Sequence, residues 1–87
     1  MSIEQIIANA EACTIIDDGC FRYPVLTADI EKAGKTKEDL RHMNGEQYTT
    51  WCDEVPMVRE VQVGTQECID LCDALETAGA KRWDIGV

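Results

Sequence analysis

The last third of the chain carries the pattern that most constrains the fold. Residues 58–63 form an alternating, β-branched run, and residues 66–78 then place apolar side chains at helical spacing. Gly79 ends the helical pattern, and residues 81–85 return to a strand-like pattern. The order strand, helix, strand predicts a βαβ unit, which joins parallel strands of one sheet by a right-handed crossover.

A β-hairpin is predicted near the N-terminus, after an amphipathic helix over residues 3–13. Residues 14–17 and 20–23 flank Asp18-Gly19, a dipeptide typical of two-residue hairpin turns. That turn would pair Ile16 with Phe21 across the two strands. The hairpin supplies the antiparallel part of the expected sheet.

Three short helices are predicted between the hairpin and the βαβ unit. The first two cover residues 28–33 and 37–43, and Pro56 ends the third, whose apolar stripe is Tyr48, Trp51, Cys52 and Val55. We therefore expect a single α+β domain over residues 1–87, with about five helices around a small mixed sheet.

The charge of the chain narrows the classes of partner. Seventeen Asp and Glu residues oppose eight Lys and Arg residues, so the formal net charge is −9. Such a chain repels phosphates, and we expect no direct binding to nucleic acid or to anionic membranes. The first residues lack the basic and apolar regions of a signal peptide, so we expect a soluble, cytoplasmic protein, monomeric or a small homo-oligomer.

The cysteines predict core packing, with no metal and no other cofactor. Their number is odd and their spacing irregular, at positions 13, 20, 52, 68 and 72. This is poor material for a disulfide framework, and the C-x-x-C pairs of structural zinc sites are absent from the sequence. Cys52 with His42 as its base would be the arrangement for nucleophilic catalysis, but no motif surrounds either residue. We expect a protein that is not an enzyme, and a small cysteine-dependent or metal-binding enzyme is a trailing alternative.

A row of carboxylates on the predicted C-terminal helix is the candidate partner-binding site. Its members are Glu67, Asp70, Asp73 and Glu76. Their spacing along the helix is close to that of phosphates along a nucleic-acid strand, so the row could imitate a nucleic-acid backbone. The simpler interpretation is a solvated helix face opposite the buried stripe.

Two other interpretations compete for the same chain. Residues 26–44 have the apolar and turn positions of a helix-turn-helix, although their basic and acidic side chains nearly balance. Trp51 and Trp83 are expected to pack in or beside the core, and a partly exposed one would be an interface anchor.

The function that we expect is binding to the basic surface of another protein, such as one that binds nucleic acid. Small inhibitors and decoys, including phage-encoded ones, are comparable in size and charge, and the comparison is only an analogy. The alternative is a small regulatory or structural subunit whose acidity has no decoy role.

Overall fold

The computed structural model describes residues 2–59 and 61–86 and confirms the α+β class. The elements are α1 (Ile3–Ala8), a 3₁₀ turn (Ala10–Ala12), β1 (Cys13–Asp17), β2 (Arg22–Leu26), α2 (Thr27–Ala33), α3 (Lys37–Arg41), α4 (Gly45–Glu54), α5 (Gln66–Thr77) and β3 (Lys81–Asp84). The three strands form a mixed sheet in the order β2-β1-β3, in which β1 is antiparallel to β2 and parallel to β3. No helix among the described residues is long and apolar enough to cross a membrane.

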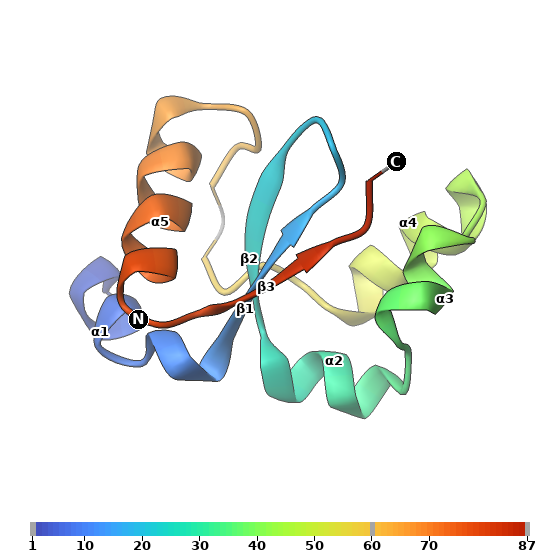
Figure 1. Ribbon diagram of the computed structural model, residues 1–87, viewed down its shortest axis with the longest axis horizontal. Coiled ribbons are helices and arrows are strands. Elements are labelled where there is room, and N and C mark those ends of the chain that lie inside the picture. The colour runs from blue at the N-terminus through green and yellow to red at the C-terminus, as the bar shows by residue number, and fades with distance from the viewer. Residues whose placement is uncertain (1, 60, 87) are drawn as a thin grey trace.

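The central strand β1 separates two layers of helices. In Figure 1, α1 and α5 lie on one side of the sheet, and α2, α3 and α4 lie on the other. Cys13 and Ile15 pack into an apolar cluster with α1 and α5, whereas Ile16 packs with α2, α3 and α4. The apolar side chains thus form one cluster on each face of the sheet.

Burial on both faces explains the composition of β1. Residues 13–16 are all buried, which suits a strand with helices on both sides. Thr14 is the polar member of this run, and its hydroxyl is hydrogen-bonded to that of Thr27 at 2.7 Å. The buried hydroxyl is therefore satisfied inside the protein.

The hairpin forms, but its register differs from the predicted one by two residues. Ile16 pairs with Tyr23 instead of Phe21, and the loop has four residues instead of two. The Asp18 carboxylate accepts hydrogen bonds from the backbone N–H groups of Cys20 and Phe21, at 2.9 and 2.7 Å, which stabilises the longer loop. A shift of two keeps each side chain on its face, so Tyr23 takes the position opposite Ile16 that we predicted for Phe21, and it is buried there.

A strand was predicted over residues 58–63, and none forms over residues 58, 59 and 61–63, which are the part of this range that the structure describes, so this part of the βαβ prediction is wrong. Met57 makes one isolated bridge to Val25, and the Val58 N–H donates to the Pro24 carbonyl. Further along the chain, the Gln62 carbonyl accepts hydrogen bonds from Thr65, the N-cap residue of α5, and so belongs to the turn into that helix. The strand parallel to β3 is β1.

Helix ends follow the capping signals of the sequence. Ser2, Thr36 and Asn44 each begin a helix with a reciprocal capping box. Gly34 ends α2 at a φ of 72°, in the left-handed region that favours glycine. These local signals set where α1, α3 and α4 begin and where α2 ends, whereas α2 begins after Leu26 without a side-chain cap.

Two glycine substitutions test the backbone account. A Cβ at Gly34 or at Gly45 meets nothing within 4 Å, so only the backbone conformation differs between them. Gly34→Ala should lower the free energy of unfolding by about 1 kcal/mol because of its positive φ. Gly45→Ala, in the first turn of α4, should raise it by about 0.5 kcal/mol. Urea unfolding measures both, and a Gly34→Ala variant as stable as the parent would contradict the assigned conformation.

Candidate functional site

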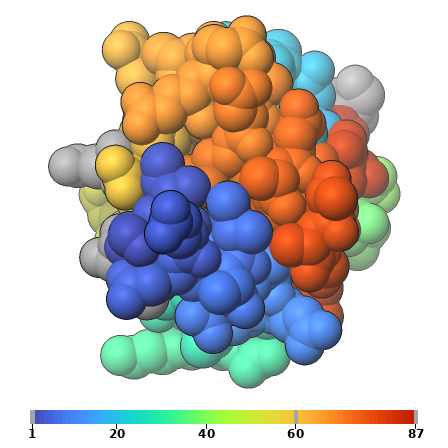
Figure 2. Space-filling model, turned by 90° about the vertical axis from the view of Figure 1, so that its left-hand side faces the viewer, coloured from blue at the N-terminus to red at the C-terminus, as the bar shows by residue number. Residues whose placement is uncertain are grey.

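The carboxylate row lies on the outer surface of α5, opposite the stripe that packs on the sheet. The buried stripe of α5 consists of Cys68, Leu71, Cys72 and Leu75. The sequence pattern also predicted Ala78 as a buried member, but Ala78 is the C-cap residue and is exposed. Figure 2 shows the outer surface of α5 open to solvent beside α1. Glu67, Asp70 and Asp73 are exposed and Glu76 is half-buried.

The row turns around the helix instead of running straight along it. Each step of three residues falls short of a full turn by about 60°, so Glu67 and Glu76 lie on opposite flanks of α5. Asp70 and Asp73 lie between them and face outward. The two middle carboxylates are therefore the ones that a partner approaching α5 from outside would meet first.

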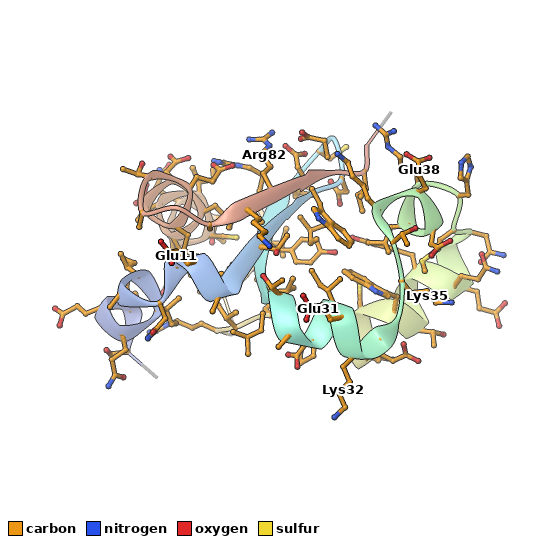
Figure 3. The ribbon with its side chains drawn as sticks, turned by 60° about the horizontal axis from the view of Figure 1, so that its bottom comes forward. Glu11, Glu31, Lys32, Lys35, Glu38 and Arg82 are labelled. Carbon is orange, nitrogen blue, oxygen red and sulfur yellow. The ribbon has the colours of Figure 1, made fainter. Side chains whose placement is uncertain are left out.

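Two arginines from the sheet hold the C-terminal half of the row. Arg22 of β2 contacts Asp73 at 2.8 Å and Glu76 at 2.5 Å. Arg82 of β3 contacts Glu76 at 3.0 Å, and Figure 3 labels Arg82 on its strand. The ion pairs therefore connect α5 to both edge strands of the sheet.

Arg82 also joins two further carboxylates to the same surface. Its guanidinium contacts Asp17 at 2.5 Å and Asp84 at 2.9 Å. The set Arg22, Arg82, Asp17, Asp73, Glu76 and Asp84 is called the acidic network below. Lys81 does not belong to it, because successive side chains of a strand point to opposite faces of the sheet.

The acidic network is negative although both arginines are paired. Its four carboxylates and two guanidinium groups leave a formal charge of −2, and Glu67 and Asp70 bring the surface of α5 to −4. Hydrogen bonds to Asp73 and Asp84, respectively, raise the pKa of Arg22 and of Arg82, so both cations persist. Sequence reasoning missed this network, because three of its five contacts join residues 51, 54 and 65 positions apart in the chain.

A second group of polar side chains lies on the other face of the sheet. The hydroxyls of Tyr23 and Tyr48 are hydrogen-bonded to each other in a mainly apolar hollow of about 380 Å³, which Cys52 also lines. Burial raises the pKa of Tyr48 to about 12 and also raises the pKa of Tyr23 and of the Cys52 thiol. A protonated thiol is a weak nucleophile.

The pairing of Cys52 with His42 has no support in the contacts. His42 is largely exposed at the end of α3 and lies 3.7 Å from Glu38, whereas Cys52 lies in the hollow with the two tyrosines. No group of three metal-ligating side chains that could hold an ion occurs in the part of the chain that the structure describes. Core packing is confirmed for Cys13, Cys68 and Cys72, while Cys20 is exposed and Cys52 half-buried.

The helix-turn-helix interpretation is weakened by the second helix of the pair. A recognition helix makes its base contacts near its N-terminus, and α3 has five residues with Glu38 and Asp39 in its first turn. If α3 lay in a DNA groove, these carboxylates would come close to the phosphate groups and be repelled by them. The absence of DNA binding stays a prediction.

The two tryptophans pack in and beside the core, as expected. Trp51 is 1% exposed and Trp83 packs beside the cluster that contains it. The aromatic side chain that is open to solvent is Phe21, in the hairpin loop.

No family model matches the chain, and comparisons with curated proteins and with solved structures give no significant match.

The acidic network should contribute measurably to stability. Arg82→Gln removes the cation that three carboxylates share and should lower the free energy of unfolding by about 1 to 2 kcal/mol at low salt. Arg41→Gln is the matched control, because Arg41 is equally exposed, at 43% against 44%, but contacts only Glu38. It should lower the free energy of unfolding by about 0.3 kcal/mol. Equal losses in urea unfolding would show that the network stabilises nothing.

The two tyrosines should titrate late and weaken the fold in alkali. A folded-state pKa above that of the unfolded chain gives stability that is complete below about pH 10 and is lost as the pH rises further. Since Tyr23 and Tyr48 are the only tyrosines, native protein at pH 10.5 should show almost no tyrosinate absorbance, and protein in urea should show more than half of it. Tyrosinate in the native protein at that pH would contradict the buried hydroxyl pair.

Proposed function

We propose that the chain is a small acidic protein-binding domain that docks on a basic surface of another protein. The partner that fits is a protein whose basic surface binds nucleic acid, and the domain then acts as an inhibitor that occupies this surface. The cytoplasm suits its five thiols. Binding rather than catalysis is the proposed role.

The observation that carries the proposal is the uncompensated charge on α5. Both arginines that contact the row are already paired, and the surface keeps a formal charge of −4. Asp73 keeps 60% of its side-chain area exposed while it contacts Arg22, so one side of this carboxylate is open to a second cation. Charges arranged in this way favour fast association with a basic partner.

The acidic network also fixes the carboxylates in place. Glu76 accepts from both arginines, and Arg82 is held by carboxylates from β1, β3 and α5. Side chains that are already ordered lose less conformational entropy when a partner binds. The network thus supports a docking surface better than a loose solvated face would.

Neutralising the two outward carboxylates tests the proposal. Asp70→Asn with Asp73→Asn should weaken the complex with a basic partner by more than about tenfold, since two charges that meet the partner are lost. The double variant should unfold within about 1 kcal/mol of the parent, because Arg22 keeps its contact with Glu76. Partners would be taken from the heparin-binding proteins of the native host, and affinities measured at two salt concentrations.

The control removes the same charge elsewhere. Glu31→Gln with Asp53→Asn changes two exposed carboxylates of α2 and α4, and Figure 3 shows Glu31 on the side of the molecule away from Arg82. This variant should keep its affinity. Equal losses of affinity in the two double variants would contradict docking through α5. An affinity that does not change with salt concentration would contradict it too. Failure of duplex DNA to displace the chain from its partner would favour the regulatory-subunit alternative.

A further inference from the structure

Exposed apolar side chains gather at one end of the molecule. Phe21 is 50% exposed, and Val63 and Ile69 are each 38% exposed. Figure 1 shows the loop between β1 and β2 rising beside the segment that leads into α5. Phe21 and Ile69 line one hollow and are called the tip patch below, whereas Val63 lines the hollow of Tyr23 and Tyr48. Single exposed apolar residues are common on protein surfaces, but a group of them marks an interaction site.

A close approach of two loops holds the centre of the tip patch. Gly64 has a φ of +88°, and a Cβ added to it would lie 2.9 Å from Cε1 of Phe21. The Phe21 ring therefore packs against a bare stretch of backbone and keeps its other side open. Tyr23 already fills the buried position in β2, so the core does not take up the Phe21 ring.

The tip patch borders the acidic network. Phe21, Gly64 and Ile69 line a hollow of about 380 Å³ together with Arg22 and Arg82. Both arginines are occupied by carboxylates, and the side chains of Asp73 and Asp84 are 60% and 59% exposed. Asp17 lines the hollow beside these arginines. The exposed carboxylates of Asp73 and Asp84, which contact Arg22 and Arg82 respectively, form an acidic rim just outside it.

We propose that the tip patch and this rim bind a basic amphipathic segment of the partner protein. An apolar side chain of the segment enters the hollow against Phe21 and Ile69, and its neighbouring Lys or Arg side chains contact Asp73 and Asp84. Charge complementarity selects this occupant, because an anionic lipid surface or a second copy of this acidic chain would be repelled. The inference rests on the proposed function and adds an apolar anchor to it.

Two synthetic peptides distinguish the contribution of the apolar anchor to the affinity from the contribution of the charge. Both have the same length and the same lysines, and the positions between the lysines hold leucine in one and glutamine in the other. The parent chain should bind the leucine peptide about tenfold or more tightly than the glutamine peptide, since burying apolar area adds to the ion pairs. Calorimetric or fluorescence titration measures both affinities.

Substitutions in the tip patch should abolish that preference. Phe21→Ser with Ile69→Ser should bind the two peptides equally, whereas Leu26→Ser should keep the preference. Leu26 is a matched control because it is 36% exposed and lies at the end of β2 away from the loop. Ile69→Ser alone, at an exposed position of α5, repeats the test if the double variant does not fold.

The outcomes distinguish the two proposals. Equal binding of the two peptides by the parent chain, or an equal loss in Leu26→Ser, overturns the anchor and leaves the acidic docking site standing. If Asp70→Asn with Asp73→Asn weakens neither peptide, the acidic docking site fails. If neither peptide binds the parent chain, both proposals are overturned.

Discussion

The strand β1 has a hydrogen-bonded neighbour on each edge and a layer of helices on each face, and the other elements are placed by what they must pair with or cover. Its Cα partners include Tyr23 of β2 and Trp83 of β3, both opposite Ile16. Cys13 and Ile15 are covered by α1 and α5, and Ile16 by the helices of the other layer. A strand buried in this way fixes its register strongly, because a slip of one residue would exchange the two faces. The position of α5, and with it the carboxylate row, follows from this packing.

Charged side chains of α5 and the sheet interact at the surface of this apolar packing. Like charges three residues apart weaken an isolated helix by a few tenths of a kcal/mol per pair, so the row on α5 is unfavourable by itself. Arg22 and Arg82 offset part of this repulsion and connect the helix to both edges of the sheet. They leave the surface negative, since six carboxylates on and around α5 face two guanidinium groups. An acidic surface that is both ordered and uncompensated is the basis of the proposed function.

The sequence predicted the local structure well and the long-range structure less well. The short helix that follows Thr36 and the buried stripe Cys68, Leu71, Cys72 and Leu75 of α5 depend on residues a few positions apart, and they appear as predicted. Residues 58–63 have a strand pattern, but whether a strand forms depends on which sheet edges are available and on the turn that Thr65 makes. The same limit applies to the site: the row was visible in the sequence, whereas Arg22 lies 51 and 54 residues from Asp73 and Glu76. The exposure of Phe21 depends on a hairpin register that the turn residues alone did not determine.

The most direct test of the account is a chemical-shift map of the backbone amides while the leucine peptide is added. The account predicts that the largest changes fall on the outer surface of α5 around Asp70 and Asp73 and on the loop around Phe21. It also predicts that α4 is unaffected, because α4 lies at the opposite end of the molecule from α5 (Figure 1). Changes confined to α3 and α4, with none on α5 or the hairpin loop, would contradict it.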